Sequence, residues 1–456
     1  MKKFFLIAMA AIATLTACNN AAEQTEDIYR TNTYMYGRTD LFNVLPVAEN
    51  DIVMVGDDYT DLGEWASFYG SNTIKNRGIR GDKASAVINR IDSVAAKKPA
   101  KLFLSEGYND IKDGAKAGDV VKNLEKVMAR IHKISPKTEL YFINIANSCG
   151  LTEEQKAEAA EVNAQMDKVK KNFTCIDLAG ALEQGLADGT FSGCNGLYLN
   201  GAGYEAYAKL LAPYVGMEAL NSAVEEDNTE VDAYLQGWYG KNEPGTCMPA
   251  EYYSHKLSVF RSLPDTHNGI VLLGDSLTDF ANWDELFPGF NIVNRGIAGD
   301  MIDGITCRLD ELEADQPNKI YVMAGCNDLG KYPEKDILDV WSSYEKLIKA
   351  IHAKFPKATL YIQSILPVSP ADGEGYKEFN KKAENLNKIL LAGKKEMNYI
   401  FVDLTEPLKD EYEDLREECT TDGCHLTATG YLTWATELLQ IGRLIVIGDP
   451  YTLTTK

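Results

Sequence analysis

Residues 270–279 read Ile-Val-Leu-Leu-Gly-Asp-Ser-Leu-Thr-Asp. Four apolar residues in succession predict a buried strand of a parallel sheet, and Gly274 ends that strand. Ser276 follows on the predicted turn at the carboxyl edge of the sheet, where open α/β sheets place their ligand sites. Its hydroxyl is therefore a candidate nucleophile, which needs a base to accept its proton.

A second stretch, Thr-Asp-Gly-Cys-His-Leu at 421–426, offers the groups that would activate such a serine. The imidazole of His425 is a candidate general base, and the carboxylate of Asp422 is a candidate for fixing its tautomer. One short loop can present both side chains. The order along the chain is Ser, Asp, His.

An internal repeat decides the predicted architecture. Gly56-Asp57 recurs as Gly274-Asp275, and the sequence Asn-Arg-Gly-Ile at 76–79 recurs at 294–297. Both pairs are separated by 218 positions, so this part of the chain is duplicated without insertion or deletion.

Each repeat alternates short apolar runs with amphipathic stretches, which predicts parallel strands joined by helices. We therefore expect an α/β protein with two tandem three-layer α/β/α domains. In the second repeat the predicted strands lie at 270–273, 290–293, 319–323, 359–365 and 399–403. The predicted organisation is a signal peptide over 1–17, a tether over 18–29, a first domain over 30–215, a connector over 216–250, a second domain over 251–445 and a tail over 446–456.

The composition and the amino terminus bear on location and partners. A net charge of -21 and a pI near 4.8 argue against nucleic acid or an anionic membrane surface as a partner. The positive start, the short apolar run and Leu-Thr-Ala-Cys at 15–18 resemble a bacterial lipoprotein signal. That resemblance implies export, cleavage before Cys18 and a lipid anchor on this cysteine. The alternative is an ordinary secretory signal with a chance cysteine.

The remaining cysteines form no Cys-x-x-Cys pair, so we expect no zinc or other metal site. Export would permit disulfides. Cys424, beside the candidate base, is interpreted as a packing residue or as one half of a local bridge to Cys419.

Two further stretches offer hydrogen-bond donors for the oxyanion that forms during acyl transfer. The glycine turn at 296–300 offers backbone N–H groups, and Asn327 offers a side-chain amide just after the third strand of the repeat. Together with Ser276, Asp422 and His425, these blocks resemble the SGNH (GDSL-type) hydrolase family, over nearly the whole second repeat. The stretch 364–368 further resembles the acetylhydrolase branch of that family.

The resemblance implies a flavodoxin-like fold and a role for each matching residue. Ser276 would be the nucleophile and would donate one backbone N–H to the oxyanion. Gly299 would donate a second backbone N–H, and Asn327 its side-chain amide. His425 would be the general base and Asp422 its orienting partner. No cofactor is implied.

The first repeat keeps the scaffold but not these groups. Asp58 stands where the second repeat has its serine, and Asn195 and Tyr198 stand where it has aspartate and histidine. The matches to the oxyanion donors, Gly81 and Asn109, are retained. The sequence predicts a pseudo-enzyme domain, which either binds a ligand in its remaining cleft or only packs against its sibling.

The sequence thus favours a serine esterase at the bacterial cell surface or in the periplasm, acting on O-acyl, foremost O-acetyl, esters of carbohydrates. The expected partners are this ester substrate and the membrane that holds the Cys18 anchor. Two alternatives stay open: a lipase or phospholipid-type acylhydrolase, and a glycan-binding surface protein with incidental esterase activity.

Overall fold

A computed structural model describes residues 32–147, 150–192, 198–220, 250–264, 269–313, 315–331 and 336–440. The predicted signal peptide and tether with Cys18, most of the connector, the predicted tail and Asn195 lie outside the described residues.

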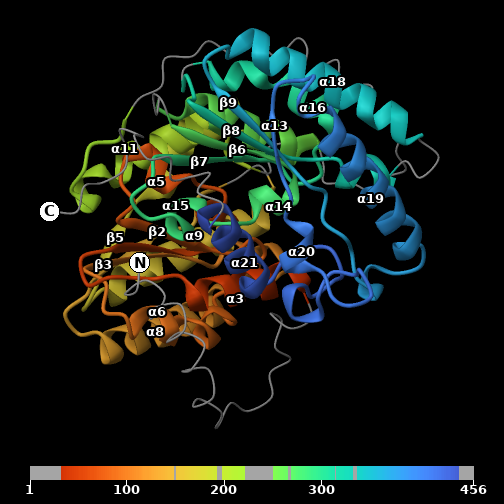
Figure 1. The fold of residues 1–456 in the computed structure, drawn as a ribbon. Coiled ribbons are helices and arrows are strands. Elements are labelled where there is room, and N and C mark those ends of the chain that lie inside the picture. Colours follow the sequence, from red (N-terminus) through yellow and green to blue (C-terminus); the bar gives the residue numbers. More distant parts are fainter. Residues whose placement is uncertain are drawn as a thin grey trace, which may run out of the picture.

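Two five-stranded parallel sheets form the framework (Figure 1). The first contains β1 (Ile52–Gly56), β2 (Ile74–Gly78), β3 (Lys101–Ser105), β4 (Glu139–Ile143) and β5 (Thr174–Ile176). The second contains β6 (Ile270–Gly274), β7 (Ile292–Gly296), β8 (Lys319–Met323), β9 (Thr359–Gln363) and β10 (Ile400–Val402). Their strand orders, β2-β1-β3-β4-β5 and β10-β9-β8-β6-β7, are the same order read from opposite edges. The predicted fold class, two α/β domains with parallel sheets, is confirmed.

Helices cover both faces of each sheet. In the first repeat they are α3 (Thr33–Val44), α4 (Asp58–Asp61), α5 (Trp65–Phe68), α6 (Ile91–Ala95), α7 (Tyr108–Lys112), α8 (Ala117–Ile134), α9 (Glu153–Val169), α10 (Leu178–Asp188) and α11 (Gly201–Val215). In the second they are α13 (Ala250–Ser262), α14 (Ser276–Asp279), α15 (Trp283–Leu286), α16 (Ile302–Cys307), α17 (Cys326–Lys331), α18 (Ile337–Lys354), α19 (Tyr376–Gly393), α20 (Thr405–Leu408) and α21 (Ala428–Gln440).

The central strands show why the layers form. All five residues of β6 are buried, and successive side chains point to opposite faces of the sheet. Val271 and Leu273 pack in a cluster with α16 and α18, whereas Ile270 and Leu272 pack in a separate cluster with α21. A strand buried on both faces therefore reads as a continuous apolar run.

The helix that precedes the first strand of each repeat packs against the other repeat. Helix α3 contacts α21, and α13 contacts α11. In Figure 1, α3 at the red end of the chain lies beside the blue α21. The apolar side chains of α3, including Met35, Leu41 and Phe42, belong to the core cluster that contains α21. The sequence predicts two tandem domains, and in the structure each of the two units packs its last helix against the helix that begins the other unit.

A buried ion pair also joins the repeats. The guanidinium of Arg77 donates two hydrogen bonds to the carboxylate of Glu285, at 2.6 and 2.8 Å, and both side chains are at most 1% exposed. Such a bidentate pair has defined geometry and is costly to break once it is buried. The two repeats are therefore held in one arrangement.

Among the described helices, none combines the length and the apolar content that crossing a bilayer requires.

Candidate active site

Ser276 lies at the carboxyl end of the central strand β6. Asp275 caps the short helix α14 by accepting a hydrogen bond from the backbone N–H of Leu277 at 3.1 Å, and Ser276 is the first residue of that helix. Gly274 allows the turn to lie close to the neighbouring strand, because a Cβ there would be 2.3 Å from the carbonyl oxygen of Met323. This turn holds the hydroxyl in place at the edge of the sheet.

The structure brings Ser276, His425 and Asp422 together. The Oγ of Ser276 lies 3.0 Å from Nε2 of His425, and Nδ1 of His425 lies 2.7 Å from Oδ2 of Asp422. The other carboxylate oxygen of Asp422 accepts the backbone N–H groups of Cys424, at 3.0 Å, and His425, at 2.7 Å. The side chains of His425 and Asp422 are 38% and 24% exposed, so the group is open to solvent on one side.

The two members of the Asp-x-x-His loop shift each other's pKa. Burial alone would lower the pKa of His425, but the hydrogen bond to Asp422 and the negative charges around it raise this pKa to about 9. Burial would raise the pKa of Asp422, but the hydrogen bond to His425 lowers it to about 2. The imidazole is therefore a stronger base than a free histidine, and its partner stays a carboxylate.

The two predicted oxyanion donors lie on neighbouring loops. Gly299 has φ of +82°, a conformation that glycine adopts without strain. Asn327, at the start of α17, donates from Nδ2 to the carbonyl oxygen of Asp300 at 2.8 Å. The carboxylate of Asp300 pairs with Arg308 at 2.9 Å, and both side chains are fully buried. The amide of Asn327 is thus oriented by a fixed backbone carbonyl.

In the first repeat, the carboxylate of Asp58 occupies the equivalent of the oxyanion hole. Its Oδ2 accepts the backbone N–H of Gly81 at 2.8 Å and the side-chain amide of Asn109 at 2.7 Å. Gly81 has φ of +80°, nearly that of Gly299, and Asn109 also donates to a backbone carbonyl as Asn327 does. The first repeat therefore fills its own site with an acidic side chain.

One contact beside the site, between Cys424 and Cys326, was not predicted from the sequence. The Sγ of Cys424, expected to be a packing residue or to bridge to Cys419, lies 3.9 Å from the Sγ of Cys326. Cys419 is instead buried in the core cluster around α21. The reason is that the loops after β8 and before α21 meet at the same edge of the sheet, although their cysteines are 98 residues apart. Within the described parts of the chain, no group of three or more His, Cys, Asp or Glu side chains could hold a metal ion.

Comparisons with known proteins show which family the chain belongs to. The model of the GDSL-like Lipase/Acylhydrolase family matches residues 55–206 and again residues 272–432. The chain belongs to this family. Both repeats of this GDSL-like protein are therefore members, including the one without the serine.

Among curated relatives, the platelet-activating factor acetylhydrolase IB subunit alpha1 of Bos taurus is 26% identical over 145 residues, which are 30% of this chain and 60% of the relative. The alpha2 subunit of Rattus norvegicus is 27% identical over 132 residues, which are 28% of this chain and 54% of that relative. The chain thus spans less than two thirds of the curated relatives it matches. A solved GDSL-like lipase from Bacteroides thetaiotaomicron is 21% identical, with a TM-score of 0.35, over 39% of this chain and 89% of that one.

Proposed function

We propose that the second repeat is a serine esterase. The Oγ of Ser276 attacks the acyl carbon of the ester while Nε2 of His425 takes its proton. The tetrahedral intermediate then expels the alcohol, which leaves with the proton from His425. A water molecule, deprotonated by the same imidazole, attacks the acyl-enzyme, releases the acid and restores the serine hydroxyl.

Asp422 serves this cycle by holding the imidazole in one tautomer. Its Oδ2 accepts a hydrogen bond from the Nδ1–H group, which leaves Nε2 free to act as the base toward Ser276. It also stabilises the imidazolium that forms after proton transfer, as the raised pKa of His425 indicates.

The observation that carries the proposal is the occupied site of the first repeat. There, a backbone N–H and an asparagine amide converge on one negatively charged oxygen, Oδ2 of Asp58, at 2.8 and 2.7 Å. Gly299 and Asn327 are the counterparts of those two donors, 218 positions later, with matching backbone and side-chain orientation. An anionic oxygen bound in this way is what acyl transfer generates.

We propose O-acetylated carbohydrates as the substrate class. The curated relatives are named acetylhydrolases, which supports acetyl as the acyl group. The lipoprotein-like amino terminus supports a lipid anchor at Cys18. The anchor would hold the protein on the cell surface or on the periplasmic face of a membrane, where it would encounter polysaccharides. The second candidate is a lipase-type acylhydrolase, because the matching family model also bears the name lipase.

The test is a screen of the purified protein on acetylated xylan, acetylated sialic acid, short-chain acyl p-nitrophenyl esters and long-chain lipid esters. We expect acetate release, and we expect Ser276→Ala to lower turnover by several orders of magnitude. Asp58→Ala, at the equivalent position of the first repeat, is the matched control and should leave turnover unchanged. A Ser276→Ala protein that retains more than about a tenth of the turnover would refute this nucleophile. Faster release of long acyl chains would favour the lipase alternative.

A further inference from the structure

Helix α3 of the first repeat packs against the second repeat beside its candidate active site. Oδ2 of Asp40, on α3, accepts the backbone N–H of Ala428 at 2.8 Å, although the two residues are 388 positions apart. Ala428 is the first residue of α21 and follows His425 by three positions. The first N–H groups of a helix lack partners within the helix, and a carboxylate at that end also interacts favourably with the helix dipole. Asp40 therefore fixes the end of the loop that carries the base.

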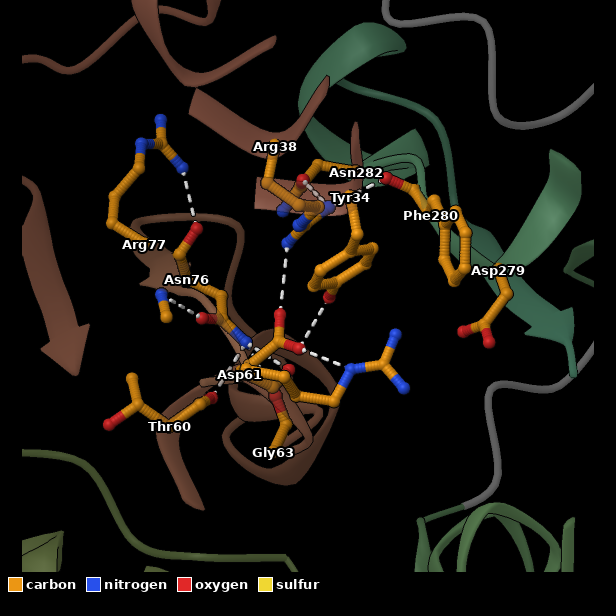
Figure 2. Close-up of polar contacts among 12 residues, drawn as sticks. Tyr34, Arg38, Thr60, Asp61, Gly63, Asn76, Arg77, Asp279, Phe280 and Asn282 are labelled. Carbon is orange, nitrogen blue, oxygen red and sulfur yellow. Dashed lines mark hydrogen bonds and ion pairs between the residues drawn. The ribbon is translucent and has the colours of Figure 1, made fainter. Parts of the chain in front are cut away.

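The same helix holds the turn that carries the nucleophile. Nη1 of Arg38 donates to the backbone carbonyl of Phe280 at 2.6 Å and to Oδ1 of Asn282 at 3.0 Å (Figure 2). Phe280 caps the four-residue helix α14, and its own N–H donates to the carbonyl of Ser276 at 3.1 Å. Because α14 is a single turn, an anchor at its end limits the motion of the serine at its start.

Arg38 is itself held by its own repeat. Its other terminal nitrogen lies 3.5 Å from Oδ1 of Asp61, and the side chain is 7% exposed. Arg38 donates to the carbonyl of Phe280, and the ring of Phe280 packs against that of His425. The two ring centroids are 5.3 Å apart, with an interplanar angle of 38°. The two anchors on α3 thus act on both partners of the 3.0 Å contact between Ser276 and His425.

We propose that the inactive repeat serves the active one through α3, with Arg38 and Asp40 as positioning residues that set the distance between Ser276 and His425. This inference rests on the proposed esterase function. Neither residue touches the reacting atoms. The first repeat is then needed for turnover even though its own site is filled by Asp58.

The exchanged helix α13 offers a matched control for Asp40. Ser258 stands 218 positions after Asp40, and its Oγ accepts the backbone N–H of Gly201 at 3.0 Å. This contact lies in the repeat without a nucleophile, so its loss should affect stability but not catalysis. Lys256, the counterpart of Arg38, donates to Oε1 of Glu64 at 2.8 Å but also lies 3.3 Å from Oδ1 of Asp279, the last residue of α14, so it is not used as a control.

The experiment uses the full chain and measures kcat and KM at 25 °C. We expect Arg38→Met and Asp40→Ala each to lower kcat about tenfold with KM within about twofold, since small misplacements of reacting groups cost rate rather than binding. Asp40→Asn keeps an acceptor oxygen and should restore most of the rate. Ser258→Ala should leave kcat unchanged. Asn282→Ala, which removes one bond to Arg38, gives a milder variant should Arg38→Met not fold.

A second readout does not depend on any ester. Hydrogen exchange of the amides at 423–430 should become faster in Asp40→Ala and stay unchanged in Ser258→Ala. The reaction of Ser276 with a fluorophosphonate should slow in Arg38→Met. A wild-type protein that hydrolyses no ester would refute the proposed function, while the exchange measurement would still test the anchor.

Two results would overturn the inference. One is an Asp40→Ala protein with unchanged kcat and unchanged exchange at 423–430. The other is an equal loss of kcat in Asp40→Ala and in Ser258→Ala, which would show a general effect of stability.

Discussion

Replacing Asn327 by alanine, beside the same change at Asn109, separates catalysis from structure within one molecule. The two asparagines occupy equivalent positions after β8 and β3, and each donates a hydrogen bond to a backbone carbonyl, at 2.8 and 3.0 Å. The second hydrogen of each side-chain amide has a different partner. In the first repeat, the amide of Asn109 donates to the carboxylate of Asp58 at 2.7 Å. In the second repeat, we expect the amide of Asn327 to donate to the oxyanion.

The magnitudes follow from these contacts. Removing one oxyanion donor costs about 10²–10³ in kcat, so Asn327→Ala should lower kcat by that factor with KM little changed. A hydrogen bond to an ionised group contributes about 1.5–3 kcal/mol to stability, and Asp58 is partly exposed, so Asn109→Ala should cost about 1.5 kcal/mol of unfolding free energy. It should leave kcat unchanged.

The assay is the steady-state hydrolysis of a short-chain p-nitrophenyl ester at 25 °C, followed by thermal melts of each variant. We expect Asn327→Ala to lower kcat without a comparable loss of stability, and Asn109→Ala to lower stability without a loss of kcat. Equal kcat in wild type and Asn327→Ala would show that this asparagine merely orders its turn. A similar loss of rate in Asn109→Ala would show that the whole molecule had been disturbed.

Three other predictions concern the site and its copy. Because only the neutral imidazole accepts a proton, kcat/KM should rise with pH up to the raised pKa of His425, near 9. Asp422→Asn should shift this rise to lower pH and reduce the rate. A pH profile of kcat/KM that is already flat above pH 7 would contradict this prediction. Incubation with oxidised glutathione should join Cys326 and Cys424, with release of two reduced glutathione molecules, and peptide mapping without reductant should show the crosslink; two thiols still reactive at equilibrium would exclude it. Finally, Asp58→Ser should give the first repeat no esterase activity when the second repeat's nucleophile is alanine, because the serine alone lacks a base; measurable turnover would end the pseudo-enzyme assignment.

The sheets could be predicted from the sequence because their strands are buried on both faces. Every predicted strand of the second repeat is present, and the largest displacement is at β7, which spans Ile292–Gly296 rather than 290–293. Phe290 belongs to the preceding turn, where its N–H donates to the carbonyl of Phe287 at 3.2 Å. An apolar aromatic residue in a turn is not distinguishable by pattern from the first residue of a strand.

The exchange of helices could not be predicted, because the repeats resemble each other. The apolar face of α3 suits the last helix of either repeat, and the pattern of Met35, Leu41 and Phe42 gives no preference. Polar contacts across the repeats, such as Asp40 with Ala428, depend on three-dimensional placement, which the apolar pattern does not specify.

The proximity of Ser276, Asp422 and His425 was predictable because residues that follow parallel strands meet at one edge of the sheet. The loss of the serine in the first repeat was also legible in the sequence. That Asp58 reaches the oxyanion donors depends on the length of its side chain and the path of the loop, which the sequence does not specify.

The exchanged helices also impose an order on the assembly of the chain as it is synthesised. Helix α3 is made before the strands of both repeats, and the residue that Asp40 binds follows 388 positions later. At typical synthesis rates, roughly 20–80 s separate the two. A helix of 12 residues is marginal alone in water, so the part of α3 that packs against α21 stays uncovered until then. The first repeat needs α13, which is the first helix of the second repeat, so it can be completed once residue 262 has been made. The two halves therefore differ: the first waits for one further helix, whereas the surface of α3 that covers α21 is exposed to aggregation and proteolysis until nearly the whole second repeat has been made.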